Sequence, residues 1–195
     1  MKAQGNAARK AVWRRAYLAT RSARRVARGN GGGRNISASA KEELDALIGE
    51  NLPGIILAGY QPLPSEVDVR PLLQRWVHKG GEVIVPTADA MSRGRYAKPR
   101  WQTLGGRPIP QGLSPSLTGA TAILIPGLAY GEDGRRLGRG AGWYDRALTA
   151  AGKGSLLIGV AFDSDVVPAG TIPVEDHDHN VGFILTPSSL RAVSP

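Results

Sequence analysis

The sequence contains no cysteine and only three histidines among its 195 residues. The absence of cysteine excludes disulfides, thiolate catalysis and cysteine-based zinc sites, and three histidines leave little scope for a histidine-based metal site. No apolar run approaches the roughly 20 residues of a membrane-spanning helix, and no apolar segment typical of a secretion signal follows the basic N-terminus. With 42% hydrophobic residues, the chain suffices for one core, and we expect a single cytoplasmic domain over residues 1–195.

Negative charge is missing from residues 1–34, which contain ten Lys and Arg but no Asp or Glu. The rest of the chain has 15 Lys and Arg against 16 acids, so the net charge of +9 belongs to this segment. Residues 8–27 have the periodicity of a helix, and a glycine-rich linker follows over 29–34. Three interpretations stay open, namely a solvated basic helix, an arm that contacts nucleic acid or another polyanion, and an organelle presequence.

The remaining chain alternates strand and helix patterns, which predicts an α/β fold. Continuous apolar runs predict strands near 55–60, 83–86, 121–125, 156–162 and 183–186. Helices are expected over 38–50 with Ser37 as N-cap, over 68–78 and over 144–151. Strands that are apolar throughout are typical of a mainly parallel sheet covered on both faces, so we expect a Rossmann-like three-layer sandwich. Residues 87–119 show little periodicity, and Trp101 within them is expected to belong to the core or to a pocket wall.

Residues 126–145 form a glycine-rich segment with arginines that suits a nucleotide. Glycines let the backbone approach a polyphosphate closely, and the start of a helix directs free N–H groups at an anion. Arg135, Arg136 and Arg139 offer bidentate phosphate contacts, and Asp145 is placed to hold Mg²⁺. The segment matches neither the P-loop nor the Gly-x-Gly-x-x-Gly pattern. A plain surface turn is the alternative, but it leaves the three arginines unexplained.

The same segment closely resembles the signature of the 5-formyltetrahydrofolate cyclo-ligase family. The motif consists of Pro126-Gly127-Leu128, Tyr130, Gly134-x-Arg136-Leu137-Gly138 and Gly140-x-Gly142-Trp143-Tyr144-Asp145. Less specific segments agree in order and spacing, namely Lys10-x-x-x-Arg14, Tyr60 with Ser65-Glu66-Val67-Asp68, and Ile172 to Asp178 ahead of Thr186-Pro187. The resemblance therefore spans about residues 10–187.

The resemblance implies an ATP- and Mg²⁺-dependent cyclisation of 5-formyltetrahydrofolate to 5,10-methenyltetrahydrofolate, with release of ADP and phosphate. It assigns the nucleotide to Lys10, Arg14, Arg136, Gly138, Arg139, Gly140, Ala141, Gly142, Trp143 and Tyr144. It assigns the folate to Gln61, Glu66, Arg139, Trp143 and Tyr144, and Mg²⁺ to Asp145 and Asp178. The implied partners are reduced folate and ATP. We expect a monomer that associates with neither membranes nor nucleic acid.

Several residues also have simpler interpretations. Lys10 and Arg14 would otherwise be solvated charges, and Glu66 would cap the helix that begins near Asp68. His177 and His179 flank Asp178, which is compatible with a metal site or with a solvated loop.

The chain departs from the family pattern at four places. Gly131 and Gly182 stand where the family usually has aspartate, Gly112-Leu113-Ser114-Pro115 replaces a Gly-Ile-x-Glu-Pro element, and Ala141 often corresponds to Gly or Lys. These departures leave open a divergent paralogue that binds nucleotide or folate with little or altered activity. Nucleic-acid binding through the basic arm is a lesser alternative.

Overall fold

The fold is built on a seven-stranded sheet of order β10-β9-β7-β4-β1-β2-β3. The computed structural model describes residues 2–28, 35–49, 54–88, 99–104, 117–175 and 178–194. The sheet comprises β1 (Ile56–Ala58), β2 (Glu82–Pro86), β3 (Trp101–Thr103), β4 (Ala122–Pro126), β7 (Leu156–Val160), β9 (Phe183–Leu185) and β10 (Leu190–Ala192). The five central strands run parallel, whereas β3 and β10 pair antiparallel at the two edges.

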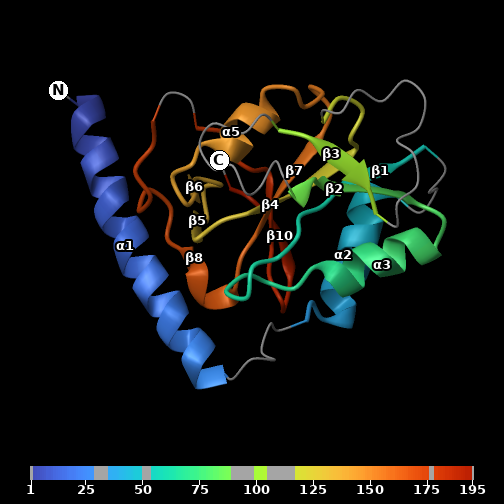
Figure 1. The fold of residues 1–195 in the computed structure, drawn as a ribbon, viewed down its shortest axis with the longest axis horizontal. Helices are drawn as coiled ribbons and strands as arrows, with labels where there is room; N and C mark the ends of the chain where they lie inside the picture. Colours follow the sequence, from blue (N-terminus) through green and yellow to red (C-terminus); the bar gives the residue numbers. More distant parts are fainter. Residues whose placement is uncertain are drawn as a thin grey trace.

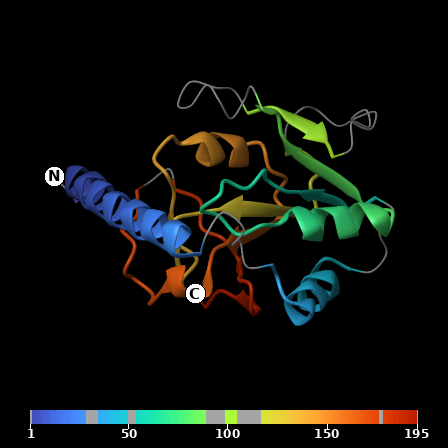
Figure 2. The ribbon, with the colours of Figure 1, turned by 60° about the horizontal axis from the view of Figure 1, so that its bottom comes forward.

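Helices cover both faces of this sheet. They are α2 (Ala38–Ile48), α3 (Arg70–His78) and α5 (Trp143–Leu148), with α2 and α5 on opposite sides (Figure 2). The expected N-cap of α2 is confirmed, since the Ser37 hydroxyl accepts a hydrogen bond from the Ala40 N–H at 3.2 Å. The central strand β4 is buried over Ala122–Ile125, which explains its purely apolar sequence. The predicted three-layer α/β fold with a mainly parallel sheet is therefore confirmed.

A second, three-stranded sheet was not predicted. It consists of β5 (Ala129–Gly131), β6 (Arg136–Leu137) and β8 (Val166–Val167), in the order β6-β5-β8. No strand was predicted within residues 126–145, but β5 and β6 pair antiparallel within them. The connection between the two strands contains Gly134, whose φ of +77° is a conformation that favours glycine.

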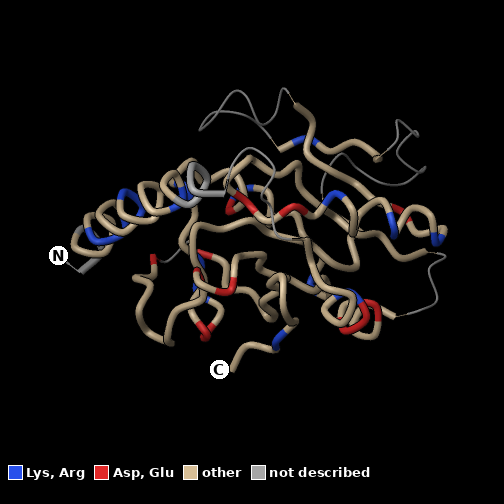
Figure 3. Tube along the Cα trace, turned by 90° about the horizontal axis from the view of Figure 1, so that it is seen from below, with Lys and Arg blue, Asp and Glu red and all other residues tan. Residues whose placement is uncertain are grey.

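The N-terminal helix α1 (Lys2–Arg28) lies along the end of the molecule that carries the small sheet (Figure 1). Figure 3 shows basic residues along it, and its sequence contains no Asp or Glu. Its Trp13 and Tyr17 stack at 5.9 Å and pack on a small apolar cluster of Leu128, Ala129, Leu137 and Ile172. Within the described part of the chain, no helix is long and apolar enough to cross a membrane.

The order of the strands creates a crevice at the carboxyl ends of the central strands β1 and β4. From β1 the chain adds β2 on one side, and it then adds β4, β7 and β9 on the other side. The loops that leave the carboxyl ends of β1 and β4 therefore diverge, and ligands of open α/β sheets bind at such a switch point. The segments that follow β1 and β4 begin at Gly59 and Gly127.

Candidate functional site

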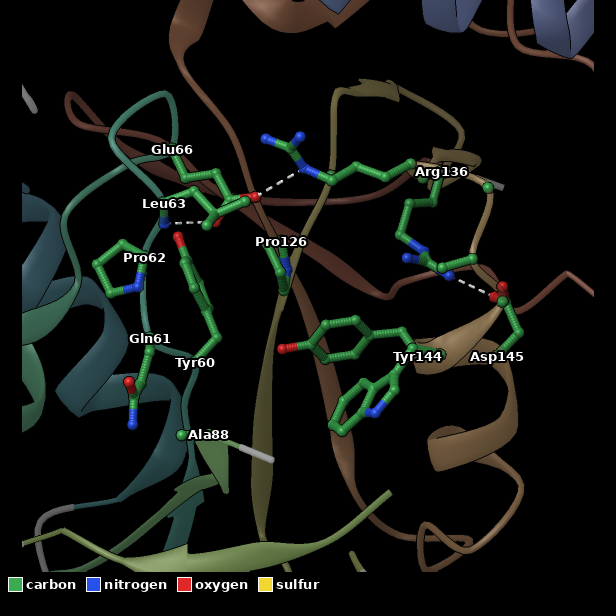
Figure 4. Close-up of a pocket in the computed structure, with 17 residues that line it drawn as sticks. Tyr60, Gln61, Pro62, Leu63, Glu66, Ala88, Pro126, Arg136, Tyr144 and Asp145 are labelled. Carbon is green, nitrogen blue, oxygen red and sulfur yellow. Dashed lines mark hydrogen bonds and ion pairs between the residues drawn. The ribbon is translucent and has the colours of Figure 1, made fainter. Parts of the chain in front are cut away.

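A cavity of about 540 Å³ opens at this switch point. Its walls come from the segments after β1, β2 and β4 and from the glycine loop before α5 (Figure 4). All five residues that the sequence assigns to the folate line it, namely Gln61, Glu66, Arg139, Trp143 and Tyr144. The structure thus brings together residues that lie up to 83 positions apart in the chain.

Aromatic rings form one wall of this larger cavity. The centre of the Trp143 ring lies 4.8 Å from that of Tyr144 and 5.6 Å from that of Trp101. Trp101 belongs to the hydrophobic core and is not among the residues that line the cavity, so the core is the one of its two expected positions that the structure shows. The Tyr144 hydroxyl and the Trp143 indole N–H are buried, and neither has a hydrogen-bond partner among the described residues. In Figure 4 the Tyr144 hydroxyl points into the space between Tyr60 and Pro126.

The Tyr144 phenol stays protonated over the physiological pH range. Burial raises its pKa well above the usual value for tyrosine, and the charge of Glu66 adds to the effect. A buried phenol without a partner is a hydrogen-bond donor available to a polar ligand atom.

Glu66 lies on the opposite wall and is bound by its neighbours. Its carboxylate accepts hydrogen bonds from the Leu63 N–H at 3.0 Å and from Arg139 Nε at 3.3 Å. Arg139 also donates to the Ser65 hydroxyl at 3.0 Å, so it joins the glycine loop to the loop after β1. The interpretation of Glu66 as a helix cap was wrong, because α3 has Val69 at its N-cap position and no side-chain cap.

A second cavity of about 200 Å³ adjoins the first and is mainly ionic. Eight residues line it, namely Arg14, Arg136, Gly138, Gly140, Gly142, Asp145, Glu175 and Asp178. Seven of them carry a nucleotide or metal assignment from the sequence, and Arg136, the three glycines and Asp145 also line the larger cavity. The two cavities therefore meet at the glycine loop.

The glycine loop lies against α1. Arg14 Nε donates to the Gly138 carbonyl at 3.1 Å, and a Cβ added at Gly140 would lie 3.3 Å from the same nitrogen. Gly140 and Gly142 have φ values of +92° and +63°, which favour glycine at both positions. The helix that follows, α5, has only six residues. Arginine side chains, rather than the dipole of this helix, thus make the loop attractive to an anion.

Two sets of ion pairs neutralise the smaller cavity. Lys10 Nζ lies 3.0 Å from Glu175 Oε2 and also pairs with Asp178, and Arg136 pairs with Asp145. Only 1% of Lys10 is exposed, so its interpretation as a solvated charge was wrong. The Arg136 guanidinium also lies 5.8 Å from the centre of the Tyr144 ring, at the junction of the two cavities.

Sequence reasoning assigned no role to Glu175. The residue lies within the Ile172 to Asp178 segment, but its pairing with Lys10 spans 165 positions and leaves no periodic signal in the sequence. Its own N–H donates to Asp178 Oδ2 at 2.6 Å, which holds the two carboxylates in one turn.

The carboxylates of the smaller cavity suit a hard divalent cation. Asp145, Glu175 and Asp178 present oxygen donors, which Mg²⁺ prefers. Over the described ranges, which omit 176 and 177, no three Asp, Glu or His side chains are arranged to hold a metal ion by themselves. This arrangement fits a Mg²⁺ ion that is held by one or two carboxylates together with phosphates and water. His177 lies outside the described residues, so both interpretations of His177 and His179, a metal site and a solvated loop, stay open.

The departures at Gly131 and Gly182 lie away from both cavities. A Cβ at Gly131 would lie 2.2 Å from Asp133 Oδ1, so the Asp133 carboxylate fills the space of a side chain there. Gly182 donates its N–H to the Leu157 carbonyl at 2.9 Å, at the edge of the main sheet. Ala141 lines the larger cavity, whereas residues 112–115 lie outside the described part of the chain.

Comparison with known proteins finds relatives that match most of this chain. A model described as the 5-formyltetrahydrofolate cyclo-ligase family matches residues 54–187. The 5-formyltetrahydrofolate cyclo-ligase of Mycolicibacterium smegmatis is 34% identical over 153 residues, which cover 72% of this chain and 78% of that protein.

Two solved structures have the same fold. The 5,10-methenyltetrahydrofolate synthetase of Aquifex aeolicus aligns with a TM-score of 0.68 and 25% identity over 95% of this chain and 93% of that one. The synthetase of Mycoplasma pneumoniae aligns with a TM-score of 0.64 and 18% identity over 91% and 98% of the two chains. Sequence motif, family model and fold agree over most of the chain, and it therefore belongs to the 5-formyltetrahydrofolate cyclo-ligase family.

Proposed function

We propose that the protein cyclises 5-formyltetrahydrofolate to 5,10-methenyltetrahydrofolate with ATP and Mg²⁺ and releases ADP and phosphate. The observation that carries the proposal is that the smaller cavity (the ionic cavity) and the larger cavity (the aromatic cavity) meet at one glycine loop. A polyphosphate suits the first cavity and a planar pterin suits the second. The junction would then hold the terminal phosphate beside the formyl group.

The chemistry requires positioning and charge neutralisation rather than a protein nucleophile. The formyl oxygen is a poor leaving group, so it attacks the terminal phosphorus of ATP and ADP departs. N10 of the folate then attacks the activated carbon and loses its proton, and the former formyl oxygen leaves with the phosphate. Bound Mg²⁺ neutralises phosphate charge, and Asp145 and Asp178 are the residues that would hold it.

The side chains of both cavities have distinct roles in this proposal. Arg14 and Arg136 bind the phosphates, and Lys10 joins them from α1. The loop from Gly138 to Gly142 lets its backbone approach the nucleotide. In the larger cavity, Trp143 and Tyr144 stack around the pterin together with Gln61, and Glu66 faces the formyl group. Arg139, which bonds Glu66 and Ser65, connects the folate to the nucleotide loop.

Residues 1–195 act as one unit in this proposal, because Arg14 of α1 lines the smaller cavity and Lys10 of α1 pairs with its carboxylates. Deletion of residues 1–34 is expected to abolish ATP binding, measured by calorimetry. The same deletion tests the nucleic-acid alternative, which predicts salt-dependent binding that is lost without the arm. Lys10 and Arg21 are buried against the body of the protein, which leaves fewer cations on α1 for such a partner.

The decisive test is formation of the methenyl product, followed by its absorbance. Product is expected only when protein, 5-formyltetrahydrofolate, ATP and Mg²⁺ are all present, with one ADP released per product. Tight ATP binding without product would reject the cyclisation and favour a divergent paralogue.

A further inference from the structure

A lysine that is nearly inaccessible to solvent pairs with two carboxylates of the smaller cavity. Lys10 is 1% exposed, and its ammonium group contacts both Glu175 and Asp178. The two carboxylates keep some contact with solvent, with 22% and 16% of their side chains exposed. Both line the cavity that the phosphates are proposed to enter. The ammonium therefore lies at the carboxylates, where a divalent cation would otherwise bind.

A second observation indicates that an anion belongs in the same cavity. Arg136 lines the cavity with only 8% of its side chain exposed, and its Nε–H is buried without a hydrogen-bond partner among the described residues. Arg14, on another wall, donates to the backbone carbonyl of Gly138 and has no carboxylate partner among the described residues. A buried guanidinium N–H without an acceptor is costly, and a phosphate oxygen is the acceptor that suits it best.

The smaller cavity thus contains both carboxylates that are paired with an ammonium group and a guanidinium N–H that lacks an acceptor. We propose that Lys10 is an internal counter-ion that masks a divalent-cation site at Glu175 and Asp178 until phosphates bind. When a polyphosphate enters, the ammonium turns to the phosphate oxygens and the carboxylates become free for the metal. The proposal rests on the nucleotide half of the proposed function and adds Glu175 as a metal-site residue.

The masking follows from the cost of isolating a buried charge. A metal ion that arrives alone must displace the ammonium and leave it unpaired in a poorly solvated position. A polyphosphate that arrives alone takes the ammonium but leaves two carboxylates beside its own negative charge. Only the two together keep every charge paired. Metal and polyphosphate are therefore expected to bind with strong mutual cooperativity.

The first test is a titration of the full-length protein with Mn²⁺ alone, followed by electron paramagnetic resonance. The wild-type protein is expected to bind Mn²⁺ weakly, and Lys10→Met is expected to bind it at least tenfold more tightly. Arg15→Met is the matched control, because Arg15 lies on the same helix, carries the same charge and is exposed. The control is expected to bind Mn²⁺ as the wild type does. A gain in Lys10→Met that the added change Glu175→Gln removes would locate the ion.

The second test keeps the lysine and removes one carboxylate. In Glu175→Gln, the factor by which Mg²⁺ tightens ATP binding is expected to fall at least fivefold in calorimetry, while Arg15→Met keeps the wild-type factor. This isosteric variant decides the question even if Lys10→Met does not fold.

The proposal is overturned if Lys10→Met gains no affinity for Mn²⁺, if Arg15→Met gains as much, or if Glu175→Gln keeps the full coupling. None of these measurements uses the folate. Failure of cyclisation in the product assay therefore leaves them unaffected, and their failure leaves the product assay unaffected.

Discussion

The two cavities differ in how their polar groups are satisfied. In the ionic cavity, the carboxylates of Asp145, Glu175 and Asp178 already have protein cations as partners. In the aromatic cavity, the Tyr144 hydroxyl and the Trp143 N–H are buried without partners in the described structure. The carboxylates of the ionic cavity are thus neutralised by protein cations, although Arg136 Nε–H lacks an acceptor there, whereas the aromatic cavity keeps neutral donors without partners among the described residues.

This difference determines what a ligand must do in each cavity. A ligand of the aromatic cavity adds hydrogen bonds to groups that have none, and it displaces no protein contact. A ligand of the ionic cavity must replace existing ion pairs, so its affinity depends on how completely it restores them. Substitutions on the two sides are therefore expected to have effects of different size and kind.

The largest effect is expected on the ionic side, from Asp145→Ala. The change removes a proposed metal ligand and the partner of Arg136. Loss of one such electrostatic contact in a reaction centre lowers turnover by about 10²–10³-fold. Initial rates of product formation measure it, with Asp68→Ala as control, since the pair of Asp68 with Arg70 lies at the surface. Normal turnover in Asp145→Ala would remove this residue from the metal site.

A smaller but still large effect is expected at the anchor that joins α1 to the aromatic cavity. Arg21 is 3% exposed, pairs with the buried Asp165, and donates to the carbonyl of Gly127 at 2.7 Å. Arg21→Met removes the cation that pairs with this buried carboxylate and is expected to lower the free energy of unfolding by about 3 kcal/mol.

Denaturant unfolding measures this loss. Arg15 lies on the same helix but is exposed, so Arg15→Met is expected to change the stability by less than about 0.5 kcal/mol. Equal stability of the two variants would show that α1 is held mainly by Trp13 and Tyr17.

A moderate effect is expected on the aromatic side, from Tyr144→Phe. The hydroxyl has no partner among the described residues, so its loss should not lower the free energy of unfolding. If the hydroxyl donates to the folate, Tyr144→Phe is expected to raise the KM for the folate by about tenfold or less, which corresponds to the free energy of one hydrogen bond. The KM for ATP is expected to stay unchanged. An equal rise in both KM values would contradict the separation of the two cavities.

Prediction from sequence succeeded where the signal was local. Continuous apolar runs gave the parallel strands, Ser37 gave a helix start, and the glycine loop gave most residues of both cavities. The small sheet was missed because β6 and β8 have two residues each, too few for a detectable alternation.

Contacts between distant segments were beyond the reach of pattern analysis. The burial of Lys10 by Glu175, like that of Arg21 by Asp165, depends on how α1 docks on the body. The helical periodicity of α1 places these cations on one face, but it does not say whether that face meets solvent or protein.

The smallest effect is expected at a cluster of ion pairs on α2 and α3. Like the ionic cavity it joins a carboxylate to cations, but its residues line neither cavity. Asp45 on α2 accepts hydrogen bonds from Arg75 and Lys79 at the end of α3, at 3.0 and 2.7 Å. Burial alone would raise the pKa of Asp45, but the two cations outweigh it, and the pKa lies below its usual value. A carboxyl with a lowered pKa in the folded state stabilises the fold above its unfolded pKa of about 3.9, and this contribution is lost as the pH falls through the folded value.

Asp45→Asn is therefore expected to lower the free energy of unfolding by about 1 kcal/mol at pH 7, since its cationic partners are partly exposed. The difference between variant and wild type should shrink as the pH falls below about 4. Denaturant unfolding across this pH range measures both, and addition of Mg²⁺ with ATP should stabilise the two proteins equally. We expect this because the three residues of the cluster line neither cavity, so the nucleotide does not compete for them. A change in the nucleotide effect in Asp45→Asn would show that exchange of ion partners is not confined to the ionic cavity.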